Sequence, residues 1–283
     1  MKKSKSTVLL ILILLLGLSL LLYPTVGEYW NSLHSSRAIA NYSEKLSSLN
    51  KEDYEHLWNA ARTFNENIHN RVNVFALDDA EKETYNQTLN LTGNGIMGYV
   101  EIPKIDSVLP VYHGTADAVL QIAVGHLEWT SLPVGGESTH SVMSAHRGLP
   151  SAKLFTDLDR LEMGDTFQVT VLDQVLTYQV DMVKVIMPHE YGDLLIQEGM
   201  DYCTLFTCTP YGINTHRLLV RGIRIETIME KPVIYVANEA FRIEPLLVTP
   251  AVAAPMVLVF LIHLMVKYRE PPKKKEGDSD HAT

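Results

Sequence analysis

The hydrophobic positions of this 283-residue chain change their spacing along the sequence, and each spacing predicts a different kind of element. Residues 8–22 and 246–266 are almost continuously apolar. The first block extends through Tyr23, and the second is long enough by itself to cross a bilayer as a helix. The pattern therefore predicts two transmembrane helices, at residues 7–23 and 245–266.

Basic residues flank both apolar blocks and predict their orientation. Three lysines lie within residues 1–6, and the tail at 267–283 carries one arginine and four lysines next to or near the second block. Because basic flanks stay on the cytoplasmic side, both termini are predicted to be cytoplasmic and the segment between the spans extracytoplasmic. A cleaved signal peptide is the alternative for the first block. The residues after Leu22 offer no small-residue cleavage site, so we favour an uncleaved anchor.

Residues 24–70 have the three- and four-residue hydrophobic spacing of helices. Asn50 is a good N-cap residue, and Asp53 would stand at the third position of the helix that follows, where an acidic side chain is favourable. We therefore expect two successive helices. Residues 71–92 show little periodicity and are expected to form a long surface connection.

From residue 93 to residue 244 the dominant period changes to two, which is typical of strands. Many short strands with turn signals and few helices predict a mainly β domain, a barrel or a sandwich. Short helical segments are expected over Leu120–Val124 and Ser151–Leu161. The expected strands are Met97–Ile102, Ser107–Tyr112, Ser141–Ala145, Thr166–Leu172, Val175–Ile186, Thr204–Cys208, Leu218–Val220 and Pro232–Val236.

The charge balance limits the partners that the chain can bind. It carries 33 acidic against 24 basic side chains, a formal net charge of −9, and several of the bases lie in the two tails. A strongly acidic domain is a poor partner for nucleic acid. It is compatible with a lysine-bearing partner, although solubility alone also favours such an excess. No CxxC or HExxH spacing occurs, so we expect neither a metal site nor a cofactor.

The chain has two cysteines, Cys203 and Cys208, which lie five residues apart. An odd spacing in a strand directs two side chains to opposite faces, so a local disulfide is not expected and only one thiol faces a reactive site. Cys208 ends its strand just before the turn at Thr209–Gly212, and is the candidate nucleophile. Cys203 is expected in the core. Because a lone cysteine is more often a small buried residue, the assignment of Cys208 depends on its partners.

Two further residues fit the chemistry of an activated thiol. His146 ends an apolar strand and is the candidate general acid/base. Arg217, nine residues after Cys208, begins the returning strand and is placed to stabilise negative charge on an acyl oxygen. Arg221 has the same parity as Arg217 and is the second candidate. The sequence leaves open which of Cys208 and His146 holds its proton more tightly.

These residues stand in motifs that resemble those of a known family. The run Thr204-Leu205-Phe206-Thr207-Cys208 with Arg217 downstream resembles the sortase signature, and Ser144-Ala145-His146-Arg147-Gly148 resembles the sortase histidine segment. The resemblance covers roughly residues 97–225 and is closer to the pilin-polymerising class C sortases of Gram-positive bacteria, which the two predicted spans also suit. The segments similar to that class are Tyr112–Thr115, Gly125–Glu128, Thr130–Gly136, His146–Asp159 and Cys208–Arg217.

The resemblance implies an eight-stranded sortase β-barrel over residues 93–244, at the outer face of the cell membrane. It implies Cys208 as nucleophile, His146 as general acid/base and Arg217 as the residue that holds substrate and oxyanion. It further implies cleavage of an LPxTG-like sorting signal between Thr and Gly, and resolution of the thioacyl-enzyme by a lysine of the next pilin. The partners would be pilin subunits that carry both the signal and the lysine.

Two alternatives to pilin polymerisation remain at this point. A housekeeping-type sortase would pass the cleaved protein to a cell-wall precursor instead of a pilin lysine. A non-catalytic adhesin or binding module with a barrel fold is the alternative outside enzymes. It would leave the combination of His146, Cys208 and Arg217 as a coincidence.

Class C sortases usually carry a lid before the barrel, with an Asp-Pro-aromatic motif over the catalytic cysteine. Residues 71–92 correspond to this lid loop, and the motif position reads Asn73-Val74-Phe75. The resemblance implies that Phe75 lies over the thiol. The aspartate and proline are missing, so we expect a looser lid in which Asp78 replaces the missing acid.

Overall fold

The computed structural model describes residues 2–71, 74–227, 258–259 and 262. The chain divides into two compact units, one formed by residues 23–239 and the other by residues 1–22 with 240–283. The predicted span at 245–266, apart from three of its residues, lies outside the described part of the chain. The strand expected at Pro232–Val236 also lies outside it.

The N-terminal apolar block is part of helix α1 (Lys2–Ser47). The stretch Leu9–Ser47 of this helix is long and apolar enough to cross a membrane, by length and composition, with a mean hydropathy of 2.6 in its most apolar window. A signal sequence near an N-terminus meets the same criteria of length and composition. The finding agrees with the span predicted at residues 7–23.

Helix α2 (Lys51–His69) begins where the sequence predicted a new N-cap. The Asp53 amide donates to Asn50 Oδ1 at 2.9 Å, and the Asn50 amide donates to Asp53 Oδ2 at 3.0 Å. This reciprocal pair is a capping box, which satisfies two amides that a helix start leaves without partners. The two helices predicted within residues 24–70 are confirmed.

The segment 71–92, expected as one unbroken connection, contains a helix, α3 (Asp79–Gln87). Asp78 is its N-cap and forms a second capping box with Glu81. Tyr85 is the buried side chain of this helix. Because α3 is short and contacts the core mainly through this one residue, it has no apolar stripe that periodicity detects.

The predicted eight-stranded β-barrel is confirmed. The strands close in the order β1-β2-β3-β4-β7-β8-β6-β5, with β2–β3 and β4–β7 parallel and the other pairs antiparallel. Closure leaves no open sheet edge. The strands are β1 (Ile96–Ile102), β2 (Ser107–His113), β3 (Val124–His126), β4 (Thr139–Ser144), β5 (Thr166–Val171), β6 (Gln174–Ile186), β7 (Asp201–Thr209) and β8 (His216–Ile225).

The short helical elements differ slightly from expectation. The helix expected at Leu120–Val124 lies earlier, as α4 (Asp117–Leu120), because Val124 already belongs to β3. Of the helical segment expected at Ser151–Leu161, the structure has only the 3-10 turn η2 (Leu158–Arg160). The other 3-10 turns are η1 (Pro103–Ile105) and η3 (Gly192–Leu194).

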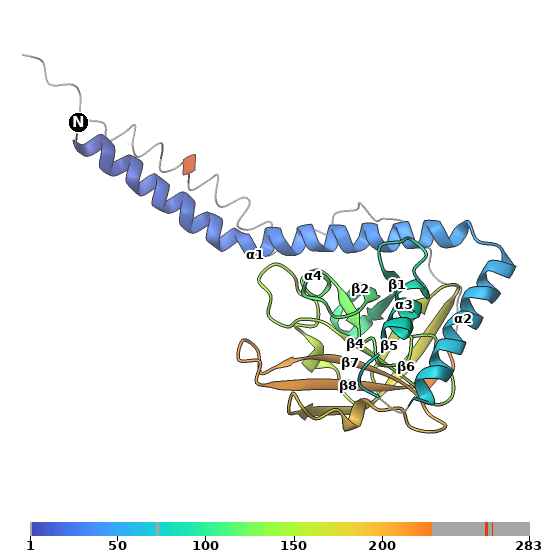
Figure 1. Ribbon diagram of the computed structural model, residues 1–283. Coiled ribbons are helices and arrows are strands. Elements are labelled where there is room, and N and C mark those ends of the chain that lie inside the picture. Colours follow the sequence, from blue (N-terminus) through green and yellow to red (C-terminus); the bar gives the residue numbers. More distant parts are fainter. Residues whose placement is uncertain (1, 72–73, 228–257, 260–261, 263–283) are drawn as a thin grey trace, which may run out of the picture. The chain divides into compact units, whose positions relative to one another are not determined.

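One apolar core fills the barrel and extends to the helices. Strand residues such as Phe167 and Leu205 are fully buried in it, and the buried face of α2 packs against them through Trp58 and Phe64. α2 and α3 accordingly run alongside the barrel (Figure 1). Each buried aromatic side chain contributes about 2–3 kcal/mol of transfer free energy. The core therefore holds the two helices that flank residues 71–77 in fixed positions.

The part of α1 that belongs to the barrel unit is held by a buried tyrosine. The Tyr42 hydroxyl donates to the Met97 carbonyl at 3.0 Å and accepts from the Leu172 amide at 2.9 Å. Burial raises the pKa of Tyr42 well above its ordinary value. The hydroxyl therefore remains protonated and keeps both bonds, which join α1 to β1 and to the β5–β6 turn.

Candidate active site

Cys208 lies near the end of β7, directly opposite Arg217 at the start of β8. In an antiparallel pair, opposite residues project from the same face with Cβ atoms about 4.5–5.5 Å apart. The turn between the strands is closed by backbone bonds from Ile213 and Asn214 to the Pro210 carbonyl, at 3.1 and 3.0 Å. The thiol and the guanidinium are thus brought together by strand register and turn length.

His146 follows β4, which runs parallel to β7 with Ser144 opposite Phe206. The Ala145 amide donates to the Phe206 carbonyl at 3.2 Å, and the Thr207 hydroxyl donates to the Ala145 carbonyl at 2.7 Å. These bonds carry the pairing one residue beyond the strand. Counted on in the same register, His146 is the residue that corresponds to Cys208.

The two cysteines occupy the different environments that their spacing predicted. Both are free, Cys203 is fully buried in the barrel core, and Cys208 is partly exposed. Burial, and secondarily the nearby Asp201 carboxylate, raises the pKa of the Cys203 thiol well above its ordinary value. Cys203 therefore stays protonated, and the thiol that solvent reaches is that of Cys208.

The two candidate arginines have different partners. Arg217 donates from Nη1 to the carbonyls of Asn214 and His216, at 3.1 and 3.0 Å. Arg221 makes a forked ion pair with Asp181, at 3.1 and 2.7 Å, and its guanidinium lies 4.0 Å from the centre of the Tyr202 ring. Arg221 stands opposite Thr204, four residues before Cys208 in β7, and its charge is neutralised there by Asp181. Arg217 is the arginine that stands directly opposite Cys208.

The structure places the three residues assigned to a lid differently. Asn73 lies outside the described residues. Asp78, expected to replace the missing acid of the lid, caps α3 instead, its Oδ1 accepting from the Glu81 amide at 2.8 Å. Phe75 is half-exposed and packs against Trp129 and Tyr191, with ring centres 5.3 and 5.7 Å away.

The rings around Phe75 belong to the same side of the barrel as the thiol. Trp129 and Phe206 both pack against a small apolar cluster separate from the main core, formed by Val142, Ile186, Leu194 and Leu219. Phe206 precedes Cys208 by two residues in β7, and side chains two apart share a face of a strand. The sequence did not single out Trp129 or Tyr191, because neither belongs to a catalytic motif. The signal that could have identified them is that each is an aromatic residue in a loop next to a predicted strand.

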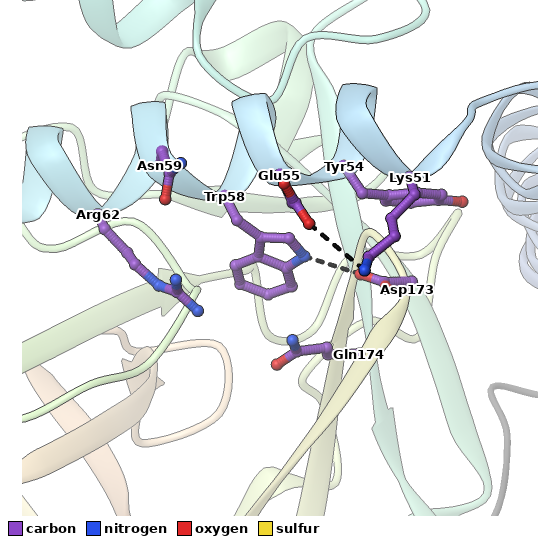
Figure 2. Close-up of a pocket in the computed structure, with 8 residues that line it drawn as sticks. All are labelled: Lys51, Tyr54, Glu55, Trp58, Asn59, Arg62, Asp173 and Gln174. Carbon is purple, nitrogen blue, oxygen red and sulfur yellow. Dashed lines mark hydrogen bonds and ion pairs between the residues drawn. The ribbon is translucent and has the colours of Figure 1, made fainter.

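Within the described residues, no group of three or more histidine, cysteine or acidic side chains is arranged to hold a metal ion. A pocket of about 470 Å³ lies between α2 and the β5–β6 turn. Figure 2 shows Trp58 at its centre, bonded to Asp173. The Trp58 Nε1 donates to Asp173 Oδ1 at 2.7 Å. β6 spans about 40 Å at 3.3 Å per residue. Because Gln174 lines the pocket and Ile186 pairs with Arg217 at the other end, the pocket is separate from the thiol site.

Comparisons with known proteins show which family this chain is similar to. Residues 100–225 match the family model of the sortase domain. Sortase C1 from Streptococcus agalactiae is 47% identical, with a TM-score of 0.66, over 67% of this chain and 98% of that chain. Sortase C from Streptococcus pneumoniae is 44% identical, with a TM-score of 0.60, over 67% of this chain and 97% of that chain.

A curated relative is more distant. Sortase D of Bacillus subtilis is 28% identical over 131 residues, which is 45% of this chain, and the match spans 63% of that protein's length. The barrel and its thiol site thus define a sortase, a family of cysteine transpeptidases. The chain belongs to the sortase family. Within this family it belongs to class C, as do the solved structures that it matches.

Proposed function

We propose that this chain is a membrane-anchored transpeptidase that cleaves an LPxTG-like sorting signal and joins pilin subunits through lysine isopeptide bonds. The observation that carries the proposal is the register that sets Cys208 opposite Arg217. The parallel β4–β7 pairing supports it, because Ser144 and Phe206 are paired two residues before His146 and Cys208. A second support is the similarity to the Streptococcus pneumoniae sortase C, whose structure is described as informative on pilin substrate specificity.

In the proposed acylation step, the Cys208 thiolate attacks the carbonyl carbon of the signal threonine. Negative charge develops on the carbonyl oxygen, and the Arg217 guanidinium on the same face stabilises it. His146 donates a proton to the glycine nitrogen as the Thr–Gly bond breaks. The glycine fragment leaves as an amine, and the threonine carbonyl is held as a thioester on Cys208.

In the proposed transfer step, the ε-amine of a pilin lysine attacks the thioester. His146 accepts a proton from that amine, and the Cys208 thiolate leaves as the isopeptide bond forms. Thiolate and imidazolium are thereby restored, and no oxidant or external energy source is needed. The acidic character of the chain, a formal net charge of −9, favours approach of a lysine-bearing partner.

We also propose that the apolar helix α1 anchors the enzyme and that the barrel lies on the extracytoplasmic face. The length and hydropathy of Leu9–Ser47 support an anchor. The basic residues in tails 1–6 and 267–283 support cytoplasmic termini. A second span at 245–266 belongs to the same proposal and rests on its apolar sequence.

Phe75 is proposed to act as the lid residue of this enzyme. Its ring rests on Trp129 and Tyr191, on the side of the barrel that carries Cys208. Aromatic contacts of this kind contribute about 0.5–1.5 kcal/mol each beyond area burial. The lid is proposed to be looser than usual, since Phe75 stays half-exposed on these rings.

The test uses the full chain in nanodiscs, a fluorogenic LPxTG-like peptide and a candidate major pilin. The wild type is expected to cleave the peptide and to build an SDS-resistant pilin ladder. Cys208→Ala is expected to abolish both activities. Cys203→Ala is the matched control, because it removes a thiol from the same strand but from the core face, and it should retain the ladder.

The other outcomes separate the alternatives. Cleavage without a ladder, together with transfer to a cell-wall precursor amine, would favour a housekeeping-type sortase. Absence of Cys208-dependent cleavage would contradict a transpeptidase and favour a binding module.

A further inference from the structure

Arg147, the residue after His146, has a nearly buried guanidinium with three protein acceptors. Only 9% of its side chain is exposed. Its Nε donates to the Thr156 carbonyl at 3.1 Å, its Nη1 donates to the Thr209 hydroxyl at 3.2 Å, and its Nη2 pairs with Asp159. The carboxylate neutralises a charge that would otherwise be costly to bury.

The acceptors of Arg147 join two segments that the proposed chemistry needs together. Thr156 and Asp159 lie downstream of His146, in the segment that leads into β5. Thr209 follows Cys208 directly at the end of β7. The Arg147 side chain therefore connects the histidine segment to the strand that carries the thiol.

Hydrogen bonds tie the chain to β7 both before and after His146. Before His146, Ala145 is bonded through its backbone to Phe206 and Thr207. After His146, the Arg147 side chain is bonded to Thr209. The two neighbours of His146 in sequence are thus tied to β7 before and after Cys208.

The next residue shows how closely this segment approaches the β7–β8 turn. Gly148 has φ +83°, which favours glycine, and a Cβ added there would lie 3.0 Å from the Tyr211 ring. A flexible surface loop would not need such a close approach. The path of the chain after His146 is therefore set by contacts on β7 and its turn.

We propose that Arg147 is a positioning residue that holds His146 in reach of Cys208 by bonding Thr209 and Thr156. The inference rests on the proposed transpeptidation and adds to it a residue that does not touch substrate. A displacement of about 1 Å in a catalytic group costs about 10²-fold in rate. Lysine keeps the charge of Arg147 but lacks the planar fork that reaches three acceptors.

The test compares Arg147→Lys, Thr209→Val and the double variant in the full chain in nanodiscs. With an LPxTG-like peptide and an amine acceptor, kcat is expected to fall about 10–100-fold in Arg147→Lys, with KM little changed. Thr209→Val, which removes one acceptor without changing shape, is expected to lower kcat in the same direction. The double variant should be no slower than the slower of the two single variants, because both single changes remove the same Arg147–Thr209 bond.

Arg224→Lys is the matched control. Arg224 donates from Nη1 to the Thr177 carbonyl and the Thr227 hydroxyl, both at 3.2 Å, in the part of β8 far from Arg217. Its loss removes the same kinds of bonds without touching the histidine segment, so kcat is expected to stay at the wild-type value. Thermal unfolding of every variant checks that the protein is folded.

Three results would overturn a part of this account, and they are distinguishable. Unchanged kcat in both Arg147→Lys and Thr209→Val, with Cys208→Ala inactive, would overturn the positioning role alone. An equal loss of kcat in Arg224→Lys would assign the effect to general destabilisation and would also overturn it. Cys208-independent or absent cleavage by the wild type would instead overturn the proposed function.

Discussion

Cys208 and Arg217 stand directly opposite each other across the antiparallel β7–β8 pair, on either side of one tight turn. Backbone register sets this relationship. A slip of one residue between the strands would move one of the two side chains to the other face of the sheet. The barrel closes around this hairpin, with β4 on one side and β6 on the other. Strand pairing thus fixes the thiol and the guanidinium before any substrate binds.

The two cysteines are expected to differ sharply in native reactivity. Iodoacetamide reacts with thiolates that solvent reaches, and Cys203 is buried with a raised pKa whereas Cys208 is partly exposed. Peptide mass spectrometry after brief labelling at pH 8 should find the adduct on Cys208. In denaturant, both cysteines should react. Labelling of Cys203 first in the native protein would show that the assignment of core and surface faces is wrong.

Stability should fall on acidification because of two buried histidines. Burial lowers the pKa of His126 to about 3 and that of His140 to about 4. The unfolded chain takes up these protons below pH 6.5, whereas the folded chain does so only near the lowered values. Each histidine therefore stabilises the fold above pH 6.5. As the pH falls from 6.5 to the folded pKa of a histidine, uptake of its proton by the unfolded chain lowers the unfolding free energy by about 1.4 kcal/mol per pH unit.

Chemical denaturation at a series of pH values measures this effect. His126→Gln should reduce the slope of unfolding free energy against pH between pH 6 and pH 4, whatever its effect on absolute stability. His189 is exposed and provides the control, so His189→Gln should leave the slope unchanged. An unchanged slope in His126→Gln would mean that His126 does not stay neutral in the folded protein.

Much of this architecture was predictable from local patterns. The period-two segments became β1, β2, β4, β5 and β6, and the Asn50 and Asp53 pair correctly marked the start of α2. The parity of Cys203 and Cys208 correctly separated a core thiol from a surface thiol. These features depend on residues close in sequence, which is why the sequence suffices for them.

The features that the sequence did not reveal depend on distant contacts. α3 was missed because its burial is concentrated in Tyr85, although the capping box of Asp78 and Glu81 was a readable signal. The bonds of Arg147 reach Thr209, 62 residues away, which no local pattern encodes. The ring contacts of Phe75 likewise join three separate segments.

The lid proposal predicts that removal of the Phe75 ring exposes the thiol. Phe75→Ala should accelerate alkylation of Cys208 by a bulky maleimide, because the ring contacts with Trp129 and Tyr191 are lost. Ile122 is 50% exposed, as is Phe75, so Ile122→Ala is the matched control and should react at the wild-type rate. Equal rates in Phe75→Ala and wild type would remove Phe75 from the lid role.

α1 makes a direct contact with the segment that follows His146. The Glu28 carboxylate accepts a bond from the Lys153 amide, and a Cβ at Gly27 would lie 2.9 Å from the Ser151 Cα. Glu28→Ala should speed hydrogen exchange of the Lys153 amide about 10–100-fold, since a bond to a charged acceptor contributes about 1.5–3 kcal/mol. Glu44→Ala, an exposed change on the same helix, should have no effect there. Equal exchange in both variants would contradict this contact.

Cys208 is proposed to carry the acyl group, and trapping of that thioester intermediate shows whether it does. The full chain would be incubated with an LPxTG-like peptide without an amine acceptor, quenched in acid and digested. The acyl mass is expected on the peptide containing Cys208, and His146→Ala is expected to lower the rate of its formation by about 10²–10⁴-fold. An acyl group on Cys203, or cleavage of the signal with no covalent adduct at any time, would contradict it.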